Sequence, residues 1–293
     1  MNLDNLTQHS GEWLRGAGPE ADIVISSRIR LARNLSAFPF TNRASTHQKA
    51  EAETYIRDRL AKLDLAPRLD YIPVGGLTPL DRQLLVERQL ISRELASAEG
   101  PRGLAVAPPE TMSIMVNEED HLRLQVIRSG FALDEAWSDI DRLDDAVENK
   151  VTYAFSEEFG YLTACPTNVG TGMRASVMLH LPALEHTKQI EKVFRALQKI
   201  NLAVRGLYGE GSRASGHFYQ ISNQVTLGKS EPQILSEIQT NILEIVRYER
   251  VARQSWLRDN KQGLQDKISR AHGTLCSATM MTSEETMELL SFV

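Results

Sequence analysis

The chain has 293 residues, of which 42% are hydrophobic and 24% charged, a balance typical of a globular protein with one domain or one and a half. Its net charge of -5 excludes nucleic-acid binding by bulk charge, so any site for a polyanion must be a local cluster of arginines. Two cysteines, Cys165 and Cys276, are too few for a disulfide framework and favour a reducing, cytoplasmic setting, and the chain has neither a secretory signal pattern nor an apolar run that could cross a membrane.

Hydrophobic periodicity predicts short strands in groups, with helices between the groups. The extended segments expected are 23–25, 104–107, 112–116, 122–127, 151–155, 161–164, 174–181, 203–205 and 219–225. The helices expected are 47–63, one from Thr78 to Leu95, 133–147, 185–201, a long one that begins after Ser230, and a last one that begins near Ser283.

This order predicts an α+β fold in which helices flank a mainly antiparallel sheet, because the strands follow one another through short turns. The composition becomes polar around residues 253–262. We therefore divide the chain into an N-terminal arm (1–20), a main domain (21–255) and a partial helical C-terminal segment (256–293). The apolar ending at 289–293 indicates a subdomain that is cut short or that packs on a partner.

The stretch Cys165–Met178 combines a cysteine, a turn rich in Asn, Thr and Gly, and an arginine before an apolar strand. Glycines allow backbone N–H groups to approach an anion, and a guanidinium beside such a turn favours a phosphate. An ordinary glycine-rich loop that leads into a core strand is the alternative.

Three further clusters contain residues that can carry chemistry. Ser26–Arg30 has two arginines at i and i+2, which point the same way on an extended segment and could grip a polyphosphate; the alternative is a solvated basic edge strand. Asn117–Arg123 has three consecutive acids, which repel one another unless a cation lies against them; the alternative is a hydrated hairpin. Arg205–Ser212 places Glu210 among glycines, as in loops that close over ligands, or in a plain hairpin loop.

In this order and spacing, the four clusters resemble the guanidino kinase (phosphagen kinase) family over residues 21–255, and in detail its bacterial branch of protein arginine kinases. The resemblance implies a glutamine-synthetase/guanidino-kinase-like catalytic domain. It also implies transfer of the γ-phosphoryl group of ATP, with Mg²⁺, to arginine side chains of proteins, which marks them for Clp-type proteolysis or regulates a repressor.

The resemblance also assigns roles to residues. Glu119 and Glu210 would be catalytic and would hold the substrate guanidinium, with Cys165 against it. Glu118 and Asp120 would touch the hydration shell of Mg²⁺, without a direct metal ligand. The phosphates of ATP would be held by Arg28, Arg30, Arg123, Arg174 and Arg205. Further nucleotide-binding positions would be Ser26, Ser27, Ile29, Ala175, Ser176, Val177, Met178, Gly206, Leu207, Tyr208, Gly209 and Glu210.

Elementary chemistry fits these roles. A guanidinium with a pKa of about 12.5–13.8 is a poor nucleophile, and paired carboxylates can orient it and accept its proton. Arginines and Mg²⁺ can neutralise the charge that spreads over a transferring phosphoryl group.

The resemblance has two departures. Gln89 stands where a histidine near the nucleotide is usual. Most of the helical C-terminal domain of the branch is missing, which puts a homodimer in doubt.

The partners implied are protein substrates with an exposed arginine, a zinc-finger-type activator and a Clp ATPase, without nucleic acid or membrane. Two other functions stay open: a kinase for free arginine or another small guanidino compound, and a non-catalytic adaptor for clients that carry arginine or phosphoarginine. Both acidic residues and all five arginines are retained, which speaks against the adaptor.

Overall fold

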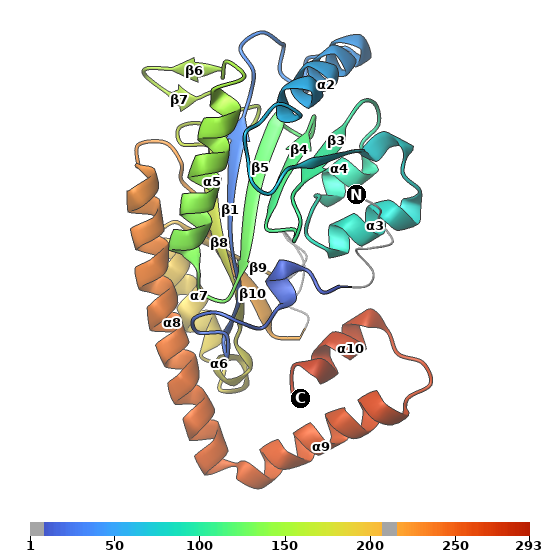
Figure 1. Ribbon diagram of the computed structural model, residues 1–293. Coiled ribbons are helices and arrows are strands. Elements are labelled where there is room, and N and C mark those ends of the chain that lie inside the picture. The colour runs from blue at the N-terminus through green and yellow to red at the C-terminus, as the bar shows by residue number, and fades with distance from the viewer. Residues whose placement is uncertain (1–8, 207–215) are drawn as a thin grey trace.

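A computed structural model describes residues 9–206 and 216–293. Its core is an eight-stranded sheet in the order β2-β3-β4-β5-β1-β8-β10-β9, in which every neighbouring pair is antiparallel (Figure 1). The strands of this sheet are β1 (Val24–Arg33), β2 (Asp70–Pro73), β3 (Gly103–Val106), β4 (Met112–Val116), β5 (Leu122–Ser129), β8 (Met173–His180), β9 (Leu202–Gly206) and β10 (Phe218–Asn223). The predicted α+β fold with an antiparallel sheet is confirmed.

Helices and short elements complete the fold. The helices are α2 (Thr46–Leu60), α3 (Pro79–Glu87), α4 (Arg93–Ser97), α5 (Leu133–Glu148), α6 (Pro182–His186), α7 (Ile190–Lys199), α8 (Glu231–Asp259), α9 (Lys261–Ser277) and α10 (Ser283–Leu290). The short elements are the 3-10 turns η1 (Glu12–Leu14), η2 (Val74–Gly76) and η3 (Pro166–Asn168) and the hairpin strands β6 (Phe155–Ser156) and β7 (Gly160–Tyr161). In the part of the chain that is described, no helix is both long and apolar enough to be a membrane span.

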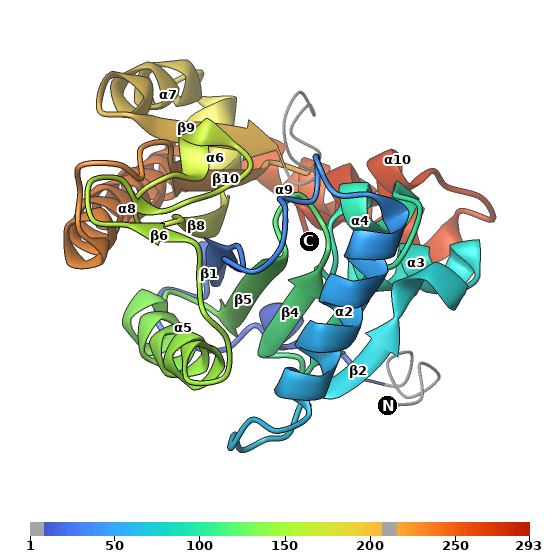
Figure 2. The ribbon, with the colours of Figure 1, turned by 90° about the horizontal axis from the view of Figure 1, so that it is seen from above.

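The two faces of the sheet are covered differently. One face buries the main hydrophobic core under α5 and α8, with Ile140, Leu143, Ile238 and Ile242 turned inward (Figure 2). On the other face, α3 and α4 bury a smaller core against β2, β3 and β4 only. The strands β5, β1, β8 and β10 are therefore open on this second face, which leaves room for a site there.

β1 lies in the interior of the sheet, paired with β5 on one side and β8 on the other. The edge-strand alternative for Ser26–Arg30 is therefore wrong, because no water-exposed strand edge remains there. β1 also runs to Arg33, well beyond the predicted segment. The buried Arg33 guanidinium makes a bidentate pair with Asp144 of α5, from Nε to Oδ1 at 3.2 Å and from Nη2 to Oδ2 at 2.6 Å, and this pair fixes β1 to the helical layer.

Several predicted elements differ from the observed ones for local backbone reasons. The single helix expected from Thr78 to Leu95 is two helices, because Gln89 adopts a left-handed conformation (φ 60°) and Ser92 caps α4. The helix expected at 185–201 is likewise divided at Lys188 (φ 57°). The segments 151–155 and 161–164 form only the short β6–β7 hairpin and isolated bridges. The domain boundary after residue 255 falls within α8 and stays a prediction.

Candidate active site

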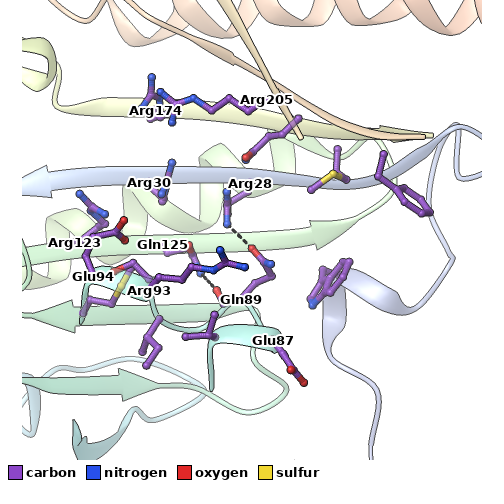
Figure 3. A pocket seen from close by; sticks show the side chains of 18 of the residues that line it. Arg28, Arg30, Glu87, Gln89, Arg93, Glu94, Arg123, Gln125, Arg174 and Arg205 are labelled. Atoms are coloured by element: carbon purple, nitrogen blue, oxygen red, sulfur yellow. Dashed lines mark hydrogen bonds between the residues drawn. The ribbon is translucent and has the colours of Figure 1, made fainter. Parts of the chain in front are cut away.

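A cleft of about 2020 Å³ opens on the uncovered face of the sheet. It is larger than the 300–1,000 Å³ or so that a single small ligand usually needs. Five arginines from four strands line it, and Figure 3 shows them gathered around one space. They are Arg28 and Arg30 of β1, Arg123 of β5, Arg174 of β8 and Arg205 of β9. The arginines predicted to hold phosphates are thus brought together.

Strand register explains how arginines so far apart in the sequence meet. Arg28 and Arg30 alternate with buried residues of β1 and point to the cleft face, as predicted from their i, i+2 spacing. Arg30 lies directly opposite Arg174 on β8, and Ala32 lies opposite Arg123 on β5. The central strand therefore supplies the base of the cluster, and its two neighbours supply the sides.

The charges of this cluster oppose one another. Burial and repulsion by Arg123 and Arg174 lower the pKa of Arg28 to about 10. Burial and the guanidinium groups of Arg28, Arg123 and Arg174 lower the pKa of Arg30 well below its ordinary value, and Glu118 opposes this shift only weakly. A bound polyanion would relieve this repulsion, so the electrostatics favour a ligand with several phosphates.

Along β1 and β8, the predicted nucleotide-binding residues divide into those whose side chains face the cleft and those whose side chains are buried in the sheet. Ser26, Ser176 and Met178 face a recess of the cleft. Ile29, Ala175 and Val177 are fully buried in the core, and the Ser27 hydroxyl donates to the Gly130 carbonyl at 2.9 Å. β8 pairs with β1 on one side and with β10 on the other, so its backbone lies in the interior of the sheet. The resemblance implies that the backbone of Ala175, Ser176, Val177 and Met178 lines the nucleotide, and this stays a prediction.

The cation beside the acidic turn Asn117–His121 is Arg123, on the strand that follows the turn. Arg123 donates to Glu118 at 2.6 Å and to Glu119 at 3.2 Å. Glu118 also accepts from the Ser92 hydroxyl at 2.6 Å, and its side chain is only 3% exposed. The hydrated-hairpin alternative is therefore wrong, since Glu118 is buried and holds Arg123.

Glu119 differs from its neighbour in exposure and partners. Its side chain is 44% exposed and lines the cleft, and its carbonyl oxygen accepts a hydrogen bond from Thr41 that fixes the turn. Burial raises the pKa of Glu119 against the influence of Arg123, and the carboxylates of Asp120, Glu118 and Glu94 raise it further. A carboxylate with a raised pKa is a better proton acceptor.

Asp120 is completely buried beneath the turn. Its Oδ1 atom accepts from the Asn34 side chain at 2.5 Å and from the Ala164 N–H at 2.7 Å, and burial raises its pKa. Its Oδ2 atom is buried without a hydrogen-bond partner among the described residues. Asp120 thus connects the acidic turn to the segment that leads to Cys165.

Cys165 lines the cleft beside Thr167, whose hydroxyl lies 3.0 Å from its sulfur. The glycines that follow it serve backbone packing. A Cβ at Gly170 would lie 2.5 Å from the Thr226 carbonyl, and the Gly170 N–H is donated to the Tyr161 carbonyl. The anion is therefore expected at the arginines rather than at glycine N–H groups of this turn.

Gly206 ends β9 beside Arg205. Leu207, Tyr208, Gly209 and Glu210 lie outside the described residues, so the predicted pairing of Glu119 with Glu210 stays a prediction.

The α3–α4 junction brings Gln89, a position expected near the nucleotide, to the cleft, whereas the contribution of Glu94 was missed. Arg28 donates to the Gln89 side chain at 2.9 Å, and Gln125 donates to the Gln89 backbone carbonyl at 2.7 Å (Figure 3). Glu94 lines the cleft at the start of α4. The sequence signal was Ser92 followed by Arg93-Glu94, a second helix start, which the prediction of one continuous helix concealed.

Comparison with known proteins shows the family of the chain. Residues 51–252 match the family described as ATP:guanido phosphotransferase, C-terminal catalytic domain. The chain belongs to this guanidino kinase family.

Relatives of this guanidino kinase cover nearly all of it. A protein-arginine kinase of Moorella thermoacetica is 47% identical over 292 residues, which are 99% of this chain and 83% of the relative. A protein-arginine kinase of Shouchella clausii is 42% identical over 296 residues, which are 100% of this chain and 83% of the relative. Among solved structures, lombricine kinase has a TM-score of 0.72 at 26% identity and covers 87% of this chain and 72% of its own.

A second solved structure, the duplicated taurocyamine kinase from Schistosoma mansoni with bound transition-state-analogue components, also has a TM-score of 0.72. It is 28% identical and is matched over 85% of this chain and 35% of its own. The guanidino kinase fold expected from the sequence is confirmed.

Proposed function

We propose that this guanidino kinase phosphorylates arginine side chains of proteins, with ATP as the phosphoryl donor and Mg²⁺ carried in with the nucleotide. The observation that carries the proposal is the convergence of five arginines and Glu119 on one cleft. The relatives that match nearly the whole chain are protein-arginine kinases, which favours a protein acceptor over a small one.

The arginine cluster acts on the phosphates. Arg28, Arg30 and Arg174 face one another across β1 and β8 and neutralise the oxygens of the triphosphate. Phosphoryl transfer depends mainly on positioning and on stabilising the charge that spreads over the transferred group. Arg123 is oriented for this task by Glu118, so the acidic turn and the cluster form one unit.

The acidic turn acts on the acceptor. Glu119 holds the arginine guanidinium in line with the γ-phosphorus and accepts a proton from the attacking nitrogen. The nitrogen–phosphorus bond forms as the bond from phosphorus to the bridging oxygen breaks, and ADP leaves with the electron pair on that oxygen. Glu210 completes the acidic pair by resemblance, and Cys165 lines the cleft next to Ala164, whose N–H donates to Asp120 of the acidic turn.

Mg²⁺ would supply further positive charge on the phosphates. The ion would be held chiefly by the phosphates of the nucleotide and by water, because Mg²⁺ at nucleotide sites usually keeps several waters and takes few protein ligands. Glu118 lines the cleft beside Arg123 and would face the ion's hydration shell, whereas the completely buried Asp120 would support the acidic turn from beneath.

The partners follow the same resemblance. We expect a zinc-finger-type activator and a Clp ATPase to act with this kinase, and the two free cysteines fit a reducing cytoplasm.

The test is incubation with ATP, Mg²⁺ and an unfolded protein rich in arginine, followed by mass spectrometry that preserves acid-labile phosphoarginine. A parallel reaction contains free arginine, and a Glu119→Gln variant is the control. We expect phosphoarginine on the protein, little on free arginine, and none with the variant. Transfer to free arginine alone would favour the small-molecule kinase, and binding without transfer would favour the adaptor.

A further inference from the structure

The C-terminal helix α10 forms one wall of the active-site cleft, although it lies outside the 51–252 family match. Residues of this segment line the same space as the arginine cluster. They are Met281, Ser283, Glu284, Thr286 and Met287. Figure 1 shows α10 returning from α9 toward the main sheet, at the end of β1 opposite the β6–β7 hairpin.

Specific contacts hold the segment in this place. The buried Ser291 hydroxyl lies between two histidines, 2.7 Å from His180 Nε2 and 2.5 Å from His217 Nδ1. Phe292 packs edge-on against His217, with ring centroids 5.2 Å apart. The fit is close in the backbone as well, because a Cβ at Gly216 would lie 2.4 Å from the Met287 carbonyl oxygen.

The orientation of ATP along β1 decides which part of the nucleotide reaches α10. The acceptor end is marked by Glu119 and Cys165, and the phosphates belong with the arginines. A nucleoside must then extend toward the start of β1, where Ile25, Met178 and Phe218 line the cleft. Ser26 lies four residues before Arg30, or about 13 Å along the strand, so the nucleoside end is well separated from the phosphate cluster.

We propose that Met281 and Met287 of the C-terminal segment contact the nucleoside of the bound nucleotide, so that α10 is part of the nucleotide-binding site. Both side chains are half-buried at the cleft and carry soft, polarizable thioethers. Such groups pack favourably against the face or edge of an aromatic base. This inference rests on the proposed use of ATP and adds a segment of the chain to its recognition.

The chain supplies a matched control. Met280 is adjacent to Met281 but is 89% exposed and does not line the cleft. Met→Gln keeps length and charge nearly constant and removes the apolar thioether. Because all three positions are at least partly exposed, these changes leave the fold intact, which thermal unfolding checks.

The experiment measures dissociation constants of ATP and of inorganic tripolyphosphate by calorimetry. For Met281→Gln/Met287→Gln we expect ATP binding weaker by roughly tenfold, from the loss of apolar contact area. Tripolyphosphate binding should stay within about twofold, because that probe reaches only the arginines. Met280→Gln should match the wild type with both probes.

Equal ATP affinity in the double variant and Met280→Gln would overturn the inference, and so would an equal loss of affinity for tripolyphosphate. Failure of the wild-type protein to bind ATP would instead remove the proposed function, so the two failures are distinguishable.

Discussion

Two neighbouring glutamates of the acidic turn should respond to the same substitution in opposite ways. Glu118 has a nearly buried side chain and accepts two short hydrogen bonds, from Arg123 and from Ser92, both at 2.6 Å. Glu119 is 44% exposed and accepts one longer bond, at 3.2 Å, from Arg123. We therefore expect Glu118 to be a positioning residue and Glu119 to be the group that touches the acceptor.

The magnitudes follow from these contacts. A hydrogen bond to a charged group is worth about 1.5–3 kcal/mol. Since Arg123 retains Glu119, Glu118→Gln should lower the free energy of unfolding by roughly 2–4 kcal/mol. Glu119→Gln removes one half-exposed ion pair and should cost less than about 1 kcal/mol. For the rate of phosphoryl transfer, Glu119→Gln should have the larger effect of the two, because loss of a general base lowers the rate by about 10²–10⁴.

Urea unfolding and a phosphoarginine assay measure both quantities on the same samples. Glu118→Gln should also raise the KM for ATP, since Arg123 loses the contact that orients it. Glu119→Gln should leave the affinity for ATP within a few-fold of the wild type. A Glu119→Gln variant with a full rate, or a Glu118→Gln variant as stable as the wild type, would refute the division of roles.

Further predictions concern charge, acidity and reactivity. Arg30→Met should weaken ATP binding by at least about tenfold without loss of stability in urea, because it removes one of several mutually repelling charges. Asp144→Asn should lower the free energy of unfolding by about 3–5 kcal/mol in the same assay, because it leaves the buried Arg33 without its charge partner. Burial lowers the pKa of His121 from 6.5 to about 4. The contribution of neutral His121 to the free energy of unfolding is then complete above about pH 6.5 and is lost as the pH falls toward 4, by up to about 1.4 kcal/mol per pH unit. Urea titrations of the wild type and of His121→Gln at several pH values would measure this difference. Alkylation of Cys165 should lower the rate of arginine phosphorylation, whereas a Cys165→Ser variant should become insensitive to the reagent.

The site could be predicted largely because its residues obey local rules. Two arginines at i and i+2 must share a face once the segment is a strand, and three consecutive acids require a cation. The sequence did not say that this cation is Arg123 itself, which was expected only at the phosphates. A pairing between residues of one turn and the strand after it depends on the hairpin's register, which local pattern does not determine.

The α3–α4 junction shows why other features were missed. Helix propensity favours a continuous helix through Gln89, yet this residue is left-handed, at φ 60°. The bonds that stabilise this conformation come from Gln125 and Arg28, which are distant in the sequence. The position of α10 likewise depends on Ser291 meeting His180 and His217, a tertiary contact without a sequence signature. Tertiary hydrogen bonds thus override the helix propensity at Gln89, and they fix the position of α10, which local sequence does not determine.

A single strand separates structural from functional arginines. β1 contains Arg28, Arg30 and Arg33. Arg33 points into the helical layer, where Asp144 neutralises it, and its contacts fully account for its presence. Arg28 and Arg30 point to the cleft, where their nearest charged neighbours include Arg123 and Arg174.

Repulsion of this kind destabilises the free protein, and packing gains nothing from it. Glu118 offsets part of this cost at Arg30, and a polyanion with several phosphates in the cleft would offset more of it. β1 therefore contains both Arg33, which is neutralised by Asp144, and Arg28 and Arg30, which face other arginines. This contrast is the strongest physical reason to place the phosphates on the cleft face of β1.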